Sequence, residues 1–232
     1  MPITLEGPSL APLSCGKAVY LVVLLHGMGS DGQGLIDIAL NWQPTSPKAE
    51  FVAPHGPFAC DGGRQWFNTE TQSLEAQLAA TREAAAILDT YLDELLAARR
   101  LDDSHLALLG FSQGAALALH VGLRRQKPIA GIVAFSGSLP FPELVPEEMR
   151  IKPPVLLVHG EADPIVPFES MRTTKDALKA LDVPVRALKR PGLGHAIDDD
   201  GVIAADDFLI KNLVPKAKAA GHDHDHDHDH DH

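Results

Sequence analysis

Three residues along the chain have the types and the order that nucleophilic chemistry at a carbonyl carbon requires. Ser112 is the central residue of GFSQG at positions 110–114, and Asp163 and His195 each follow a later apolar run. A serine hydroxyl is a weak nucleophile at neutral pH, so it needs a histidine to accept its proton and a carboxylate to orient that histidine. The order Ser, Asp, His predicts that Ser112, Asp163 and His195 form a catalytic triad.

The residues around Ser112 strengthen this prediction. An apolar run at 106–109 precedes the pentapeptide and an alanine-rich run at 115–121 follows it. A strand, a sharp turn and a buried helix form the context of a nucleophile elbow, in which glycines let the strand and the helix approach closely. A Gly-x-Ser-x-Gly pentapeptide alone arises by chance in roughly one chain in ten of this length. The prediction therefore depends on the flanking runs and on the two downstream partners.

The candidate acid and base lie in short polar segments after apolar runs. Asp163 belongs to HGEADPIVP at 159–167, where Glu161 is the alternative acid, and Pro164 favours Asp163 because it restricts the turn that follows. His195 ends PGLGH at 191–195. Because the carboxyl ends of parallel strands open onto one edge of a sheet, we expect these segments to lie together.

Four other histidines are assigned to different roles. We expect His26 and His55 to hold their loops by hydrogen bonds rather than to act as bases. His105 is expected at the entry of a strand and His120 on the helix after the elbow. Neither of these two is expected in the triad.

The apolar patterning predicts an α/β fold with a mostly parallel central sheet and helices on both faces. Continuous apolar, β-branched runs predict buried strands, and 3.6-residue periodicity predicts helices. The expected strands are 18–25, 50–53, 106–109, 129–135, 155–158 and 183–188, with a short edge strand at 3–6; the expected helices are 34–40, 74–100, 115–121, 169–181 and 202–213. A long loop is expected at 55–73, and loops of this length are usually functional.

Composition limits the class of protein. The 232 residues are 45% hydrophobic and 22% charged, which predicts one globular domain over residues 1–221. The formal net charge is −11, and the acidic balance argues against nucleic acid or an anionic membrane surface as the main partner. No apolar run reaches 18 residues and the start lacks a secretory signal pattern, so we expect no stable membrane insertion and a cytoplasmic location. Cys15 and Cys60 are expected as reduced thiols.

The last eleven residues, 222–232, alternate His and Asp. Such a segment cannot form a packed core, so we expect it to be a disordered tail. It is either a native tail that binds a divalent metal through imidazole and carboxylate groups or a purification tag, and the sequence leaves both readings open. No metal is expected in the catalytic site.

Six segments together resemble the carboxylesterase/phospholipase family of α/β hydrolases, which includes acyl-protein thioesterases and bacterial carboxylesterases. They are LLHGMGSDG at 24–32, APHGP at 53–57, QWFN at 65–68, GFSQG at 110–114, HGEADPIVP at 159–167 and GLGH at 192–195. The resemblance implies an α/β-hydrolase fold, the triad Ser112, Asp163 and His195, and no cofactor. It also implies an oxyanion hole made by the backbone N–H groups of Met28 and Gln113, a position where the family often has Leu or Tyr instead of Met28.

The resemblance and the long loop further suggest that Trp66 and its neighbour Phe67 bind substrate, with Trp66 lining the acyl pocket. Ordinary core packing is the alternative for Trp66. Asp163 follows Ser112 by only 51 positions, which leaves no room for an inserted cap domain. We therefore expect an open, shallow site.

The first hypothesis for function is a serine carboxylesterase that acts on short- to medium-chain acyl esters through an acyl-enzyme. A lysophospholipase or an acyl-protein thioesterase is the alternative, because one triad serves oxygen esters and thioesters. A remote third hypothesis is a non-catalytic or metal-binding protein on a hydrolase fold. The expected partner is a small-molecule acyl ester or lipid substrate, and the expected state is a monomer or a weak homodimer.

Overall fold

A seven-stranded sheet runs through the centre of the computed structural model, which describes residues 4–70 and 73–213. Its strand order is β1-β3-β2-β6-β7-β8-β9, and every neighbouring pair is parallel except β1 with β3. The strands are β1 (Ser9–Leu10), β2 (Tyr20–Leu25), β3 (Ala49–Val52), β6 (Leu106–Phe111), β7 (Gly131–Phe135), β8 (Val155–Gly160) and β9 (Val185–Arg190). The mostly parallel sheet predicted from the apolar runs is confirmed.

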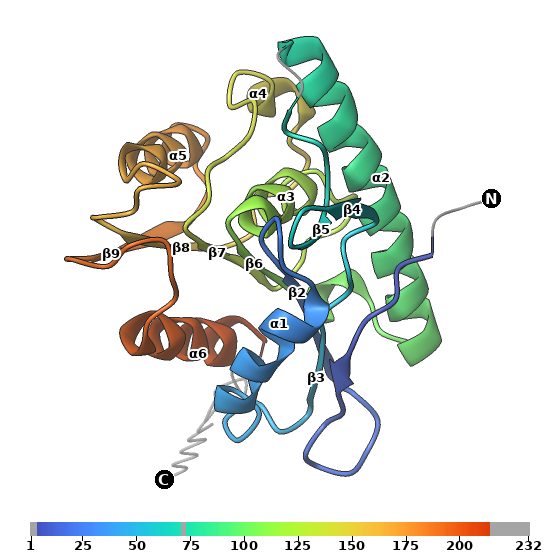
Figure 1. Ribbon diagram of the computed structural model, residues 1–232. Coiled ribbons are helices and arrows are strands. Elements are labelled where there is room, and N and C mark those ends of the chain that lie inside the picture. The colour runs from blue at the N-terminus through green and yellow to red at the C-terminus, as the bar shows by residue number, and fades with distance from the viewer. Residues whose placement is uncertain (1–3, 71–72, 214–232) are drawn as a thin grey trace, which may run out of the picture.

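Helices cover both faces of this sheet (Figure 1). On one face lie α2 (Leu74–Arg99), α3 (Gln113–Gly122) and α5 (Glu169–Ala180); on the other lie α1 (Gly32–Ile36), the 3-10 helix η1 (Asp37–Asn41) and α6 (Asp199–Leu213). Successive strand residues alternate between two cores, so Val23 packs under α2 and α3 whereas Val22 and Leu24 pack toward α6. Full burial of each such side chain stabilises the fold by about 1.5–3 kcal/mol.

Two short helical elements complete the chain, η2 (Asp103–His105) and α4 (Val145–Glu148). Between Ser112 and Asp163 the chain contains only α3, β7, α4, β8 and their loops, so the described residues hold no inserted cap domain, as predicted. Among the residues described, no helix is both long enough and apolar enough to cross a membrane.

The first strand differs from the prediction. The expected strand 3–6 begins outside the described residues, and residues 4–6 form no strand. Instead the strand is Ser9–Leu10, which pairs with Phe51 and Val52 of β3. The segment before it is held by other backbone bonds, since Glu6 and Pro8 accept from the N–H groups of residues 55 and 53. Pro8 has no N–H with which to continue a ladder, so regular pairing starts after it.

The expected long loop contains a β-hairpin, β4 (Phe58–Cys60) and β5 (Gly63–Gln65). The two strands are joined by Asp61 and Gly62, and Gly62 has a φ of +84°. An Asp-Gly pair between strands is a strong local signal for a two-residue hairpin turn. The sequence therefore contained the signal for this hairpin.

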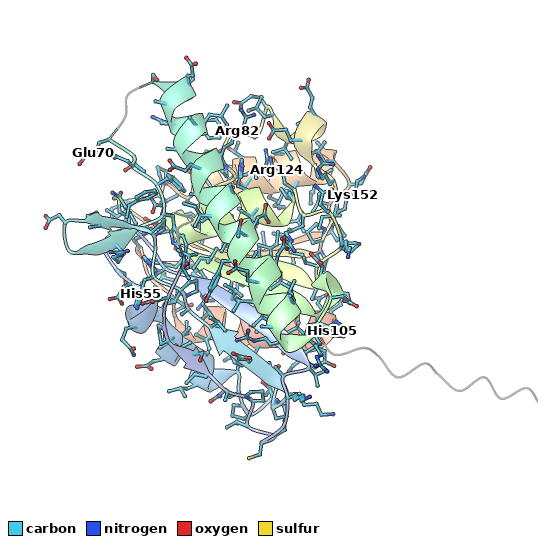
Figure 2. The ribbon with its side chains drawn as sticks, turned by 90° about the vertical axis from the view of Figure 1, so that its right-hand side faces the viewer. His55, Glu70, Arg82, His105, Arg124 and Lys152 are labelled. Carbon is cyan, nitrogen blue, oxygen red and sulfur yellow. The ribbon has the colours of Figure 1, made fainter. Side chains whose placement is uncertain are left out.

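Charged side chains attach the helices of the α2 face to one another. In Figure 2, which looks onto α2, Arg82 and Arg124 lie near each other at its upper part. Both guanidinium groups bind the carboxylate of Glu148, at 2.6 Å and 2.7 Å, so α4 is tied to α2 and α3. Farther down, buried Arg125 binds Asp89, Asp93 and Asp103.

Candidate active site

Ser112 occupies a strained turn between β6 and α3. Its φ of +55° and ψ of −117° lie in a region that non-glycine residues rarely adopt. The turn is held because the Ser112 N–H donates to the Phe135 carbonyl at 2.9 Å and the Ser112 carbonyl accepts from Ala116 at 3.1 Å. The hydroxyl makes no capping bond to α3. The backbone thus presents an uncommitted hydroxyl at the end of β6, as a nucleophile elbow requires.

The two glycines of the pentapeptide are required by close packing. A Cβ on Gly110 would clash with the carbonyl of Gly114, and a Cβ on Gly114 would clash with the carbonyl of Leu25 at the end of β2. The start of α3 can therefore touch both β6 and β2. This contact brings the N-terminus of α3 next to the loop that follows β2.

Asp163 is placed by the turn after β8. Its side chain has no exposed surface, and Oδ1 accepts hydrogen bonds from the N–H groups of Ile165 at 2.8 Å and Val166 at 2.9 Å. Burial pushes the pKa of Asp163 upward, but the hydrogen bonds from His195 and from these two amides outweigh it. The pKa lies below its ordinary value, so the carboxylate is ionised at neutral pH.

His195 binds the other oxygen of this carboxylate. Its Nδ1 lies 2.7 Å from Asp163 Oδ2, and its ring packs against Phe111 in a tilted arrangement, with 4.8 Å between centroids and 44° between the ring planes. Because a carboxylate only accepts, Nδ1 carries the proton and Nε2 is left to act as a base. Phe111 directly precedes Ser112, so this contact places the imidazole near the elbow. The side chain is 17% exposed, so solvent reaches it.

The acid and base loops are joined through their backbones. Ala162 donates to the carbonyl of Leu193 at 3.0 Å, and Glu161 donates to Arg190 at 2.9 Å. A Cβ on Gly160 would clash with the Leu193 carbonyl, so this glycine allows the two loops to meet. Glu161, the alternative acid, instead points to Lys189 at 3.3 Å. The geometry thus pairs His195 with Asp163.

Ser112 and His195 form no direct hydrogen bond here, and such bonds are often long before substrate binds.

Met28 and Gln113 are brought to neighbouring positions, one after β2 and the other at the start of α3. Neither backbone N–H donates to an acceptor among the described residues. A Cβ on Gly27 would lie 3.3 Å from Ser112 Cβ, so the loop carrying Met28 reaches the elbow. Free N–H groups beside a nucleophile can accept the charge that develops on a carbonyl oxygen. The Met28 side chain is 54% exposed at the rim of the site.

Trp66 does not have the position that the acyl-pocket prediction needs. Its side chain is 0% exposed, and its indole N–H donates to the carbonyl of His26 at 2.9 Å. The ring also lies against the His26 imidazole. The buried indole has an N–H that must find an acceptor, and the loop after β2 supplies it. The packing alternative therefore describes Trp66, which lies beneath the site instead of lining it. Phe67 is half-buried against the main core, and its contact with substrate stays a proposal.

A cavity of about 330 Å³ opens beside the elbow. Its apolar lining comes from the loop after β2, α1, η1, the end of β6 and the loop after His195: Met28, Leu35, Ile38, Phe111 and Ile197. Ligand pockets usually enclose about 300–1,000 Å³, so this volume lies at the small end of that range. The cavity suits a short apolar group.

The four histidines that were expected outside the triad, His26, His55, His105 and His120, lie where they were expected. His26 and His55 each accept a backbone N–H, from Gly56 at 2.8 Å and from Gly32 at 3.1 Å. Figure 2 shows His55 beside the hairpin and His105 near the C-terminal end of α2, at opposite sides of the molecule.

His159 is a site residue that the sequence analysis missed. It is buried, its Nε2 donates to the Val166 carbonyl at 2.8 Å, and the same atom lies 3.4 Å from Asp163 Oδ2. The spacing of four residues between His159 and Asp163 could have drawn attention to it.

Comparisons with known proteins find relatives along most of the chain. Residues 14–213 match the model of the Phospholipase/Carboxylesterase family. The chain is 30% identical over 226 residues to acyl-protein thioesterase 1 of Neurospora crassa, covering 89% of this chain and 91% of that protein. It is 29% identical over 230 residues to acyl-protein thioesterase 1 of Gibberella zeae, with 89% and 97% covered.

Solved structures agree with this assignment. The crystal structure of esterase PE8 has 41% sequence identity and a TM-score of 0.86, covering 91% of this chain and all of that chain. SOBER1 of Arabidopsis thaliana has 25% identity and a TM-score of 0.71, with 84% and 99% covered. These similarities confirm the predicted α/β-hydrolase fold. The His-Asp tail at 222–232 lies outside the described residues.

Proposed function

Because this chain belongs to the phospholipase/carboxylesterase family of α/β hydrolases, we propose that it hydrolyses short- to medium-chain acyl esters through an acyl-enzyme on Ser112. Its membership makes it a serine hydrolase that acts on acyl esters. The chain length and the covalent route are our proposal. One observation carries it: a strained serine, whose hydroxyl caps no helix, directly follows Phe111, and Phe111 packs against a histidine whose Nδ1 is held 2.7 Å from a buried carboxylate.

In the proposed first half-reaction, His195 Nε2 takes the proton of the Ser112 hydroxyl while Oγ attacks the ester carbonyl carbon. The carbonyl electron pair moves onto oxygen, where the N–H groups of Met28 and Gln113 stabilise the negative charge. The tetrahedral intermediate then collapses, and the departing alkoxide takes the proton from His195. The ionised Asp163 stabilises the imidazolium that exists in between.

In the second half-reaction, a water molecule takes the place of the alcohol. His195 accepts a proton from this water, the hydroxide attacks the acyl-enzyme carbonyl, and the Ser112 oxygen leaves with the proton returned by His195. The partly exposed His195 ring allows water to enter from the open edge.

The cavity beside the elbow supports the limit on chain length. Each methylene buried there adds about 0.8 kcal/mol of binding until the apolar lining ends. A volume of about 330 Å³ and the absence of a cap between Ser112 and Asp163 in the described residues leave little surface to cover a long chain.

A thioesterase acting on acylated proteins is the second candidate. The relatives from Neurospora crassa and Gibberella zeae carry the name acyl-protein thioesterase 1. An open site without a cap would also admit an acyl group attached to a protein surface.

The cytoplasmic location and the monomeric or weakly dimeric state stay predictions.

Rates on p-nitrophenyl esters from acetate to palmitate, compared with a lysophospholipid and a palmitoyl-thioester peptide, test the proposal. We expect a maximum at short to medium esters and a loss of about 10⁴-fold or more in kcat for Ser112→Ala. A rate that rises through the palmitate ester, or preference for the thioester peptide, would transfer the function to the second candidate. Turnover by Ser112→Ala near the wild-type rate would refute the covalent route.

A further inference from the structure

The side chain of Gln113 connects the elbow to the segment after the hairpin. Its Oε1 accepts from the backbone N–H of Trp66 at 2.7 Å, and its Nε2 donates to the carbonyl of Phe67 at 2.8 Å. Both ends of the amide are therefore used, and the side chain is buried. A buried amide whose donor and acceptor are both satisfied fixes the relative position of the two segments it joins.

The same segment is bound to the loop that carries Met28. The backbone carbonyl of Arg64 accepts a hydrogen bond from the N–H of Gly29 at 3.0 Å. The backbone N–H of Arg64 donates to the carbonyl of Ser30 at 2.8 Å. Two residues further on, the Trp66 indole donates to the carbonyl of His26 at 2.9 Å. Arg64 and Trp66 thus hold the loop on both sides of Met28.

The hairpin is itself closed by side chains. Arg64 donates from Nε to the carbonyl of Gly56 at 2.8 Å and from Nη2 to that of Pro57 at 3.0 Å. His26 accepts the Gly56 N–H at Nε2, so its Nδ1 carries the proton and donates to the Gly27 carbonyl at 2.7 Å. In Figure 1 the hairpin lies against α3 and the end of β2; α3 begins with Gln113, and the loop after β2 carries Met28.

We infer that Arg64, Trp66 and Phe67, together with the Gln113 side chain, form a brace that sets the distance between the Met28 and Gln113 N–H groups. Gln113 then has two roles, a backbone donor to the oxyanion and a side chain that positions both donors. Trp66 is a positioning residue in the same brace. This inference rests on the proposed function, because only an oxyanion makes the spacing of the two amides matter.

The brace predicts a particular pattern of kinetic effects. Binding of an ester in its ground state depends on the cavity, whereas stabilisation of the oxyanion depends on both amides. Displacement of a catalytic group by ~1 Å can cost about 10²-fold in rate. Loss of the brace should therefore lower kcat and leave KM nearly unchanged, since the lost interaction is made in the transition state.

The experiment compares the wild type with Gln113→Met, Trp66→Phe, their double variant and the control Gln65→Met. Gln65 is a neighbouring amide whose side chain makes only a long bond, 3.4 Å, to the Ala59 carbonyl. Each protein is assayed with p-nitrophenyl butyrate and with an alkyl trifluoromethyl ketone. The ketone forms a hemiketal: Ser112 Oγ bonds to the carbonyl carbon, the π pair moves to oxygen, and the serine proton passes to His195.

We expect Gln113→Met to lower kcat and the affinity for the ketone by the same factor, about 10- to 100-fold, with KM within threefold of wild type. Trp66→Phe removes the indole N–H and part of the ring but keeps the backbone bond to Gln113, so it should show a smaller loss of the same kind. The double variant should lose less than the product of the two single losses, because both residues hold one unit. Gln65→Met should match the wild type within twofold.

A folded Gln113→Met protein with wild-type ketone affinity, or single losses that multiply fully, would overturn the brace. If Gln113→Met does not fold, Gln113→Glu and Trp66→Phe decide by the same comparison. Gln113→Glu keeps an acceptor for the Trp66 N–H and loses the donor to Phe67. A wild type that neither turns over the ester nor binds the ketone would instead contradict the proposed function.

Discussion

The two sides of the proposed reaction centre are held in different ways. On the oxyanion side, the amides of Met28 and Gln113 are fixed by many backbone and side-chain bonds from residues 56–67. On the acid–base side, the His195 ring is held, among the described residues, by one hydrogen bond to Asp163 and by a tilted ring contact with Phe111. The difference follows from their tasks: an oxyanion hole must be rigid before charge develops, whereas an imidazole must exchange protons with two partners.

This comparison leads to a general expectation. A single substitution that breaks the hydrogen bond between Asp163 and His195 should remove everything that this bond contributes to kcat, because no second hydrogen bond holds the ring in the part of the chain that the structure describes. A single substitution on the oxyanion side should cost less, because the remaining bonds of the brace still restrain the amides. The loss in kcat should therefore be largest for the bond between Asp163 and His195 and smaller for any one bond of the brace.

The largest effect should come from Asp163→Asn. The amide cannot stabilise an imidazolium and favours the wrong tautomer of His195, so kcat should fall about 10⁴-fold. Steady-state kinetics on the best p-nitrophenyl ester measures this loss. The matched control is Glu161→Gln, which removes a carboxylate two residues away that binds Lys189. Near wild-type activity in Asp163→Asn together with a large loss in Glu161→Gln would reverse the assignment of the acid.

A smaller loss is expected from His159→Leu. The variant removes the N–H that holds the Val166 carbonyl at 2.8 Å and lies near Asp163 Oδ2, so the turn that presents the carboxylate loosens. We expect kcat to fall about 10-fold, because His159 acts through the turn that presents Asp163 and does not itself touch a reacting atom.

His159→Gln, whose amide nitrogen can reach the same carbonyl, should recover most of the lost activity. Equal activities in the Leu and Gln variants would mean that packing around His159, not its hydrogen bond, supports the acid.

On the oxyanion side, Arg64→Met should have a milder effect than either change at the acid. It removes two hydrogen bonds that close the hairpin, but the Arg64 backbone bonds to Gly29 and Ser30 do not depend on its side chain. We expect kcat to fall about three- to tenfold with KM unchanged, as for partial loss of transition-state stabilisation. A loss as large as that of Asp163→Asn would show that the two sides are equally sensitive.

The smallest effect on kcat is expected from a substitution of His120, which belongs to neither the oxyanion side nor the acid–base side. Burial lowers the pKa of His120 to about 4, with help from the positive charge of Arg124 and against the opposing charge of Glu148. The unfolded chain then binds more protons than the folded protein between about pH 4 and 6.5. Stability should therefore decrease as pH falls, by about 2 kcal/mol between pH 7 and pH 5.

Urea unfolding of wild type and His120→Leu at these two pH values measures this contribution. The variant also removes a buried Nδ1 that has no hydrogen-bond partner among the described residues. It should flatten the pH dependence and leave kcat unchanged. A slope that persists in the variant would assign the pH dependence to other groups.

Sequence reasoning reached most of the fold because its signals are local. Apolar β-branched runs marked the parallel strands, and the long periodic segment at 74–100 became α2 (Leu74–Arg99). The boundaries differ by a few residues, and the edge strand formed at Ser9–Leu10 because Pro8 and its neighbours bond to the loop after β3. The hairpin was missed although Asp61-Gly62 marks its turn.

Within the site, the types and order of residues were enough to select Ser112, Asp163 and His195, since each lies in a short motif after a strand. The error at Trp66 has a physical reason. An aromatic residue in a long loop can face either a pocket or the core, and the local sequence looks the same in both cases. Only the acceptor offered by His26, which lies 40 positions earlier, decides which way the indole turns.

The sequence by itself therefore determined the strands and the elbow and selected the proposed reacting groups, because backbone preferences and chemical types are properties of short segments. The tertiary structure decided which carboxylate oxygen meets His195, which loops support the oxyanion amides, and which neighbours surround His159. Those choices depend on hydrogen bonds between residues far apart in the chain, which exist only after the sheet has brought its strand ends together.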